Sequence, residues 1–232
     1  MNKKFNRYTA KDYINFNQWH YKTSIWKARN IIKILERNKL KPKSICEVGC
    51  GGGEILKNLE DIDYVEYLDG YDISKEAFKV NRTKQSKKVN FYLKDVCEIN
   101  AYYDLLLSID VFEHVENYIE FIRENKKKAE YKIFHIPLEI SITAIISGGF
   151  IRARNDVGHI HYFTIETAIE TLKDADLEVI DYFFTAPFES NGPPKNTLRS
   201  KVLKYPRQLI FMLSPEFCSK TIGGCSLMVL AK

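Results

Sequence analysis

The chain alternates short apolar runs with segments in which apolar residues recur three and four positions apart. The first pattern is typical of buried strands and the second of helices that cover a core. The expected strands are residues 44–48, 65–72, 89–93, 103–109, 131–136, 177–185 and 226–231. Strands that alternate with helices predict βαβ units and a sheet with both faces covered. The predicted fold class is therefore α/β, with a doubly wound, mainly parallel, seven-stranded sheet.

The segment before the first strand is expected to form a helical cap. Apolar residues recur at helical spacing from Ser24, a possible N-cap, to Lys41-Pro42, where proline ends the helix. Residues 1–22 are aromatic and polar without a clear period, and we expect them to form a cap or lid. We therefore divide the chain into an N-terminal helical cap, residues 1–43, and a larger domain, residues 44–232.

Two segments of the larger domain depart from the alternation. Residues 137–163 follow the fifth strand, and residues 187–222 separate the last two strands. No helix of ordinary length is clearly indicated between those two strands, so we expect an antiparallel, hairpin-like finish with a long insertion. Because long connections are often functional, we expect both segments to help bind a substrate.

A glycine-rich loop follows the first strand in the sequence Glu47-Val48-Gly49-Cys50-Gly51-Gly52-Gly53. Glycines let the backbone turn sharply and approach a ligand closely, and the start of the following helix offers free N–H groups to an anionic group. A dinucleotide-binding loop would need another glycine at position 54, which is Glu54. The carboxylate of Glu47 suits a ligand with an ammonium group.

Acidic residues follow the other strands at the same edge of the predicted sheet, where open α/β sheets bind ligands. Asp72 ends the second strand, where it could accept hydrogen bonds from ribose hydroxyls. Asp95 follows the third strand and could accept from an adenine amino group, with Ile73 and Val96 as apolar faces for the ring. Asp110 ends the fourth strand. With Glu47 they make four acids at successive strand ends in register with the glycine loop, a pattern that coincidence explains poorly.

The segment from Glu47 to Gly53 resembles the first motif of the class I S-adenosylmethionine-dependent methyltransferases. Residues 110–115 and 158–164 resemble the segments after the fourth strand and before the penultimate helix of small-molecule members. The likeness covers about residues 44–185. It implies a Rossmann-like fold whose last strand lies antiparallel between the fifth and sixth. It also implies S-adenosyl-L-methionine as the cofactor, held by Glu47, Gly49, Gly51 and the strand-end residues Asp72, Ile73, Asp95, Val96 and Asp110.

Methyl transfer to a hydroxyl oxygen needs alignment with the sulfonium methyl group and removal of a proton. Histidine suits the proton transfer near neutral pH, and the candidates are His114, His159 and His161. Arginine fits phosphate or carboxylate groups, so Arg152 and Arg154 are candidates for binding the acceptor. His20 and Tyr21 could reach the acceptor if the N-terminal segment folds over the site.

The acceptor is expected to be a small molecule that is anionic or sugar-linked. Residues 135–139 look like those of bacterial methyltransferases that modify surface polysaccharide precursors. The Asn/Asp-Pro-Pro-Tyr motif of many nucleic-acid amino methyltransferases is missing at residues 110–113, so a nucleic-acid acceptor is less favoured. Two alternatives remain: an RNA methyltransferase that uses basic ends as a phosphate footprint, and a non-catalytic module that only binds the cofactor.

Composition and charge refine this picture. Residues 1–43 hold twelve Lys and Arg against two acids, and residues 191–232 hold seven against one, so the ends could attract an anionic substrate. The five cysteines form no CxxC pair and no Cys/His zinc spacing, so we expect no metal and activity that survives a chelator. Residues 140–151, the longest nearly uncharged run, are too short to span a bilayer. No apolar signal region follows the N-terminus, and we expect a cytoplasmic protein.

Overall fold

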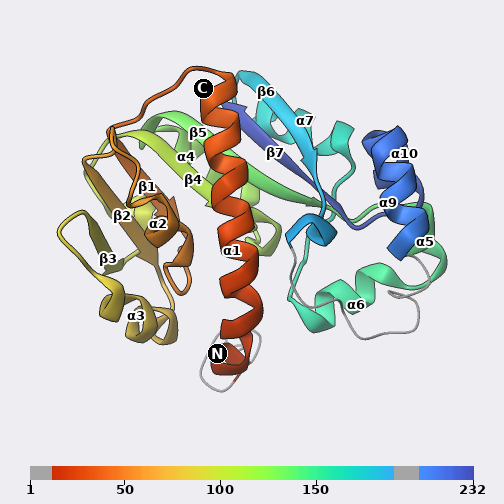
Figure 1. Ribbon diagram of the computed structural model, residues 1–232, viewed down its shortest axis with the longest axis horizontal. Helices are drawn as coiled ribbons and strands as arrows, with labels where there is room; N and C mark the ends of the chain where they lie inside the picture. Colours follow the sequence, from red (N-terminus) through yellow and green to blue (C-terminus); the bar gives the residue numbers. More distant parts are fainter. Residues whose placement is uncertain (1–11, 191–203) are drawn as a thin grey trace.

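The computed structural model describes residues 12–190 and 204–232 (Figure 1). They form a seven-stranded sheet in the order β3-β2-β1-β4-β5-β7-β6. The strands are β1 (Ser44–Val48), β2 (Tyr67–Asp72), β3 (Val89–Leu93), β4 (Tyr103–Ile109), β5 (Ala129–Leu138), β6 (Val179–Thr185) and β7 (Cys225–Ala231). β7 pairs antiparallel with both β5 and β6, and the other pairs are parallel. The prediction of a mainly parallel α/β sheet with an antiparallel last strand is confirmed.

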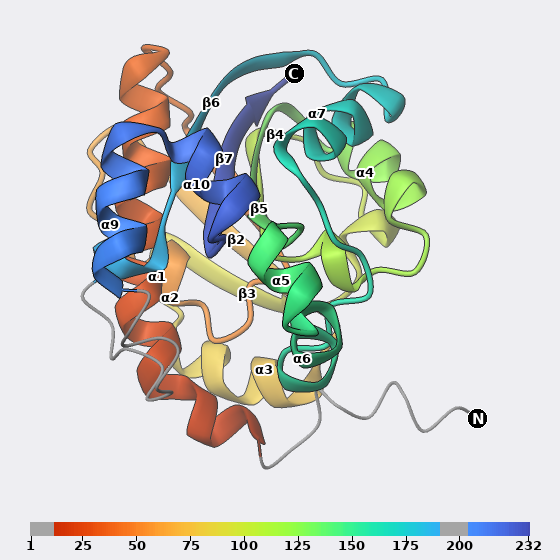
Figure 2. The ribbon, with the colours of Figure 1, turned by 90° about the vertical axis from the view of Figure 1, so that its right-hand side faces the viewer.

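Helices cover both faces of the sheet (Figure 1, Figure 2). The α-helices are α1 (Asp12–Arg37), α2 (Glu54–Leu59), α3 (Lys75–Asn81), α4 (Tyr118–Lys126), α5 (Ile142–Ile146), α6 (Gly149–Asp156), α7 (Ile165–Asp174), α9 (Lys204–Leu213) and α10 (Pro215–Thr221). Short 3-10 turns are η2 (Arg82–Lys84), η3 (Val96–Glu98), η4 (Phe112–His114) and η5 (Pro187–Ser190). Side chains cap two of these helices: Ser74 accepts a hydrogen bond from Ala77 N at the start of α3, and Thr164 accepts one from Thr167 N at the start of α7.

The strands bury side chains on both faces because successive residues point to opposite sides of a sheet. On one face, Ile45 and Leu105 pack against Ile31, Ile34 and Leu35 of α1 and against α2. The opposite face forms two further clusters, one under α4 and α7 and one around Cys46, Tyr71 and Leu106. The N-terminal helix therefore shares its core with the sheet that carries the site.

The N-terminal helix extends further toward the N-terminus than the sequence pattern indicated. The prediction that it begins at Ser24 is wrong, since α1 is described from Asp12 and Ser24 is buried inside it. No glycine or proline occurs between residues 12 and 37, so nothing in the backbone interrupts a helix there. The helix ends at Arg37, and Lys39 follows in a left-handed conformation with φ 54°. Residues 1–11 of the expected lid lie outside the described residues.

The connection between the last two strands also contains more structure than expected. We expected no helix of ordinary length there, and this prediction is wrong, because α9 has ten residues and α10 has seven. Ser214 caps α10 and Pro215 occupies its first turn, a start signal that the sequence already carried. The remainder of the expected excursion, residues 191–203, lies outside the described residues. Nowhere in the described ranges does a helix combine the length and apolar character needed to cross a membrane.

Candidate active site

The glycine loop lies at the carboxyl end of β1, beside the ends of β2 and β4. Gly49, Gly51 and Gly53 have φ values of 63°, 53° and 79°, which side chains other than glycine rarely adopt. A Cβ atom on Gly53 would lie 2.4 Å from the ring of Phe91. Asn81 Nδ2 donates to the Gly51 carbonyl over 3.0 Å. The loop is therefore held tightly in a shape that only glycine permits.

Asp72 joins this loop to the end of β2. Its Oδ2 accepts a hydrogen bond from Gly51 N over 2.8 Å, and its Oδ1 accepts one from Ser74 N over 2.7 Å. Burial raises the pKa of Asp72, and these backbone hydrogen bonds partly offset the rise. The carboxyl group is thus held in place by the backbone of both segments, and its predicted contact with ribose stays a prediction.

Glu47 is buried close to the loop, with 2% of its surface exposed. Its Oε2 has no hydrogen-bond partner, and burial raises its pKa well above the ordinary value. The ammonium group of Lys27 on α1 acts in the opposite direction and favours the charged carboxylate. An unpartnered carboxyl oxygen beside the glycine loop fits a ligand that carries an ammonium group.

The three residues expected around adenine have different environments. The Ile73 side chain is 69% exposed and available to a ligand. Asp95 accepts a hydrogen bond from Cys97 N over 2.9 Å and caps η3. Val96 is 1% exposed and packs in the core near Tyr71. The Val96 side chain thus points inward and fills the core, and its predicted contact with the adenine ring stays a prediction.

Asp110 lies at the end of β4 in a left-handed conformation with φ 56°. Its Oδ2 lies 2.5 Å from Lys27 Nζ, and its Oδ1 lies 2.5 Å from His135 Nδ1. The other ring nitrogen of His135 lies 2.9 Å from Thr185 Oγ1. Burial opposes the charged form, but His135 and Lys27 outweigh it and hold the pKa of Asp110 below its ordinary value. Asp110 thus ties α1 to the strand ends, and its expected contact with the cofactor stays a prediction.

Asp110→Asn is expected to remove part of the acid sensitivity of the fold. A carboxyl whose pKa is depressed on folding adds stability above its unfolded pKa of about 4, and this stability is lost as pH falls toward the folded pKa. Asparagine keeps the shape of aspartate and tolerates a left-handed conformation. Urea unfolding at several pH values should therefore show a steeper loss of unfolding free energy below about pH 4 in the wild type than in the variant. If the unfolding free energies of the wild type and the variant fall equally as pH decreases, the pKa of Asp110 is not lowered by folding.

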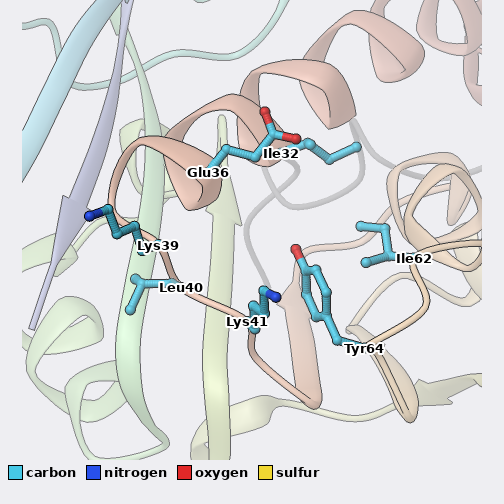
Figure 3. Close-up of a pocket in the computed structure, with 7 residues that line it drawn as sticks. All are labelled: Ile32, Glu36, Lys39, Leu40, Lys41, Ile62 and Tyr64. Carbon is cyan, nitrogen blue, oxygen red and sulfur yellow. The ribbon is translucent and has the colours of Figure 1, made fainter.

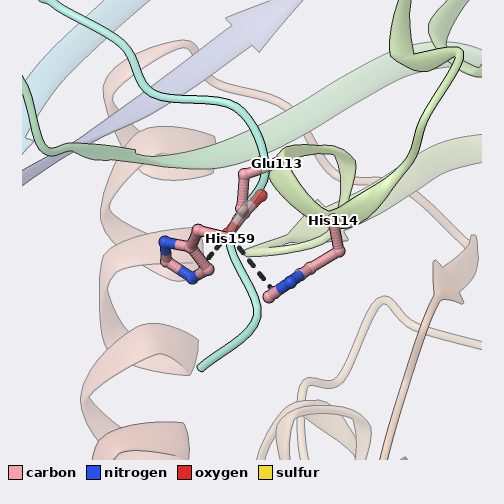
Figure 4. A group of neighbouring side chains, drawn as sticks. All are labelled: Glu113, His114 and His159. Carbon is pink, nitrogen blue, oxygen red and sulfur yellow. Dashed lines mark ion pairs between the residues drawn. The ribbon is translucent and has the colours of Figure 1, made fainter. Parts of the chain in front are cut away.

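Glu113, His114 and His159 form a cluster next to this network (Figure 4). Glu113 is fully buried, neither carboxyl oxygen has a hydrogen-bond partner, and burial followed by the charge of Asp110 raises its pKa well above the ordinary value. His159 Nε2 lies 3.9 Å from Glu113 Oε1. His159 Nδ1 lies 2.8 Å from Glu139 Oε2, within ion-pair distance but without hydrogen-bond alignment. His159 is thus flanked by two carboxyl groups.

The three candidate bases differ in what surrounds them. The His114 ring lies edge-on to His159, with centroids 4.7 Å apart, and burial lowers its pKa to about 4. A group with this pKa is a weak proton acceptor. His161 Nε2 lies 2.9 Å from the carbonyl of Val115, and its ring packs on Tyr118. The two histidines of the His159-Ile160-His161 segment therefore contact different partners.

The same cluster brings together donors that could hold a metal ion. One atom each from Glu113, His114 and His159 lies within 4.8 Å of the others. The sequence offered no such set by spacing, because His159 is 45 residues away from His114. The expectation that activity does not need a metal stays a prediction.

The residues expected to bind the acceptor lie on two helices. Arg152 and Arg154 belong to α6, and the exposed guanidinium of Arg152 donates to the carbonyl and hydroxyl oxygens of Ser147. His20 and Tyr21 belong to α1, but their side chains lie outside what the structure describes. The roles of all four residues stay predictions.

A pocket of about 450 Å³ lies away from this site (Figure 3). It is formed where α1 ends and before β1 begins, which is the opposite edge of the sheet from the glycine loop. Its lining residues are Ile32, Glu36, Lys39, Leu40, Lys41, Ile62 and Tyr64. None of the predicted site residues lines it.

The strand order, the antiparallel β7, the glycine loop and Asp72 together define a class I S-adenosylmethionine-dependent methyltransferase. The chain belongs to the methyltransferase domain family, which matches residues 19–182. Its cofactor is S-adenosyl-L-methionine.

Three relatives illustrate the similarity. The ubiquinone biosynthesis O-methyltransferase of Rickettsia bellii is 31% identical over 98 residues, which are 41% of each chain. The mitochondrial enzyme of that name from Saccharomyces cerevisiae is 26% identical over 86 residues, 34% of this chain and 28% of the relative. This chain thus matches less than half the length of these curated relatives. The magnesium protoporphyrin IX methyltransferase of Synechocystis, with bound SAH, shares the fold with a TM-score of 0.61 and 13% identity, over 99% of this chain and 93% of that one.

The roles of Lys27, Glu113 and Glu139 were not predicted from the sequence. Glu113 precedes a candidate base, and Glu139 follows the fifth strand directly, so both had a positional signal. Lys27 had none beyond its place in a helix. Its approach to Asp110, 83 residues along the chain, depends on how α1 crosses the sheet.

Proposed function

We propose that this protein transfers the methyl group of S-adenosyl-L-methionine to an oxygen atom of a small acceptor. The observation that carries the proposal is His159, which lies between the carboxyl groups of Glu113 and Glu139. Glu113 in turn feels the charge of Asp110 at the end of β4. The arrangement offers a proton acceptor, as transfer to a hydroxyl group requires.

The residues at the strand ends fit the cofactor. Glu47 has a buried carboxyl oxygen without a partner, and the cofactor carries an ammonium group and a sulfonium charge. Asp72 would hold the ribose, the glycine loop would approach the methionine part, and Ile73 with Asp95 would contact the adenine. When bound, the cofactor supplies the electrophilic methyl group. The protein's own residues bind it, orient the acceptor and move the acceptor proton.

In the proposed mechanism, His159 accepts the proton of the acceptor hydroxyl as the oxygen attacks. Glu139 lies 2.8 Å from the other ring nitrogen and would stabilise the positive charge that the imidazole ring gains. His114 is a weaker proton acceptor because burial lowers its pKa to about 4, and His161 contacts the Val115 carbonyl instead of a carboxyl group. Both observations favour His159 as the base. The rest of the rate acceleration would come from holding the acceptor oxygen in line with the methyl group of the cofactor.

The proposed acceptor is anionic or sugar-like, such as a precursor of a bacterial surface polysaccharide. The likeness of residues 135–139 to methyltransferases of that kind supports it, as do Arg152 and Arg154 on α6. The curated relatives named above are O-methyltransferases, which supports oxygen as the receiving atom.

Acceptor screening tests this proposal. Purified protein would be incubated with S-adenosyl-L-methionine and with sugar nucleotides, phosphorylated metabolites, hydroxylated aromatic compounds or RNA, and S-adenosylhomocysteine would be quantified. We expect turnover with a small hydroxylated compound and none with RNA. Turnover only with RNA, with affinity that falls steeply as salt rises, would favour the RNA alternative. Cofactor binding without turnover on any acceptor would favour the binding module.

Asp72→Ala is expected to weaken binding of S-adenosylhomocysteine by about 1–3 kcal/mol, which is about 5- to 150-fold. The change removes an acceptor for ribose hydroxyls and also the anchor of Gly51 N. Isothermal titration calorimetry measures the effect, with Asp63→Ala, an exposed acid in the turn before β2, as the control. An unchanged dissociation constant in folded Asp72→Ala would show that the cofactor binds elsewhere.

A further inference from the structure

The carboxyl group of Glu113 is buried without a hydrogen-bond partner, although buried polar groups in proteins almost always have one. Neither of its oxygens has a partner among the described residues, and its side chain is 0% exposed. Two imidazole rings face it, since Nε2 of His159 lies 3.9 Å and Nε2 of His114 lies 4.0 Å from its Oε1 (Figure 4). Both distances are too long for hydrogen bonds, so the rings alone do not compensate for the burial of this group.

The backbone brings these three side chains together. Glu113 and His114 belong to η4, directly after β4, whereas His159 belongs to the connection between α6 and α7. The carbonyl of Glu113 accepts hydrogen bonds from Ile160 N over 3.0 Å and from His161 N over 3.1 Å. These two donors directly follow His159 in the chain. The ring of His159 is therefore held near Glu113 by backbone contacts on the same two segments.

Each imidazole ring also has a partner besides Glu113. His159 Nδ1 lies 2.8 Å from Oε2 of Glu139, within ion-pair distance. The ring of His114 has a hydrogen bond with the backbone of Gly158. Histidines that bind metal ions are usually oriented in this way, by a carboxylate or a backbone carbonyl at the ring nitrogen that does not touch the ion. The cluster thus has converging donor atoms and also the groups that orient them.

We propose that Glu113, His114 and His159 bind a divalent transition metal ion such as Zn²⁺. One donor atom of each residue lies within 4.8 Å of the others. The ligand atoms of a tetrahedral zinc ion lie about 2 Å from the ion and about 3.4 Å from one another, a spacing that short side-chain rotations can reach. Two imidazole nitrogens favour zinc, cobalt or nickel over magnesium and calcium, which prefer oxygen ligands. The ion supplies the positive charge that a buried carboxylate needs.

The bound ion inhibits methyl transfer, and this consequence rests on the proposed function. In that mechanism Nδ1 of His159 is next to Glu139, so the acceptor proton goes to Nε2, which is the nitrogen that faces Glu113. A nitrogen bound to a metal ion has no lone pair left for a proton. Methyl transfer therefore stops while the ion is bound and returns when a chelator removes it, in agreement with the expectation that activity does not need a metal.

Metal titrations test the site without any acceptor. The full chain would be freed of metal with a chelator and titrated with Co²⁺, whose visible absorption intensifies in a protein site of low coordination number, and then with Zn²⁺ in competition. We expect one ion per chain. Glu113→Gln and His114→Ala each remove a ligand and should raise the dissociation constant about tenfold or more. Glu139→Gln removes the charge that orients His159 and should raise it about tenfold.

His161→Ala is the matched control, because this histidine lies in the same segment but contacts the carbonyl of Val115. It should bind cobalt like the wild type. Thermal melting without metal shows whether each variant is folded, and zinc should raise the melting temperature of the wild type and of this control most. Equal dissociation constants in the wild type, Glu113→Gln and His114→Ala would overturn the site, as would a wild type that binds no cobalt.

Turnover tests the inhibition separately, with the acceptor found by screening. Zn²⁺ should stop turnover of the wild type, and EDTA should restore it. The zinc concentration that halves turnover, measured against each protein's own metal-free rate, should rise about tenfold or more in His114→Ala. Full turnover of the zinc-bound protein would overturn the inhibition, as would a loss of turnover when metal is removed. If no acceptor is methylated, the proposed function fails, and the cobalt titration still decides the metal site.

Discussion

Replacing His159 by alanine is expected to lower turnover by about 10²-fold or more, while the affinity for S-adenosylhomocysteine changes little. The change removes the proposed proton acceptor, which lies between Glu113 and Glu139. The main residues proposed to hold the cofactor belong to the glycine loop and the end of β2, away from His159 in the chain, so we expect them to keep their structure. The measurement is the steady-state rate with the acceptor found by screening, together with calorimetry of cofactor binding.

His161→Ala is the matched control for this prediction. Its ring contacts the Val115 carbonyl and Tyr118 instead of the carboxyl cluster, so we expect a much smaller loss of turnover. Near-normal turnover in His159→Ala would show that His159 is not the base. If His161→Ala then lost turnover instead, the base would be the other histidine of this segment. If neither did, alignment of the substrates alone would carry the reaction.

Gly53→Ala is expected to lower the free energy of unfolding by about 2–5 kcal/mol and to abolish cofactor binding. The left-handed conformation costs about 1–2 kcal/mol for a residue with a side chain, and forced overpacking costs about 1–3 kcal/mol. The added Cβ would lie 2.4 Å from the Phe91 ring and 3.2 Å from Cβ of Asn81. Phe91 is 2% exposed in the core, so its ring has little room to move.

Gly52→Ala is the control, because it changes the neighbouring residue of the same loop. Its φ lies outside the left-handed range, and the nearest atom to the added Cβ is the flexible Lys84 Nζ at 3.6 Å. Urea unfolding of both variants should show a large loss of stability for Gly53→Ala and a small one for Gly52→Ala. Equal midpoints would show that the loop adapts more freely than its packing indicates.

The sheet could be predicted from the sequence because each strand is a continuous apolar run next to turn residues. The bounds of β3 and β4 agree with the prediction, and β5 extends beyond it to Ala129 and Leu138. The antiparallel place of β7 came from the likeness to known methyltransferases. The helices α1 and α9 were harder to predict, because their apolar residues share the surface with aromatic and basic ones and blur the helical period.

The cofactor side of the site was also visible in the sequence, since glycine spacing and strand-end acids are local features. The contacts that each of these side chains makes could not be predicted from the sequence. Val96 and Asp95 are neighbours, yet one side chain fills the core and the other caps a turn. A short 3-10 turn decides which of them points inward, and no periodic pattern reports that choice.

The sequence by itself determined the seven strands along the chain, the glycine loop and the edge of the sheet where the acids gather. These follow from local backbone preferences and from the alternation of apolar residues. Only the tertiary structure decided that Lys27 meets Asp110 and that His159 rather than His161 faces Glu113 and Glu139. Such contacts join residues far apart in the chain, and they depend on how whole elements pack, which local sequence does not encode.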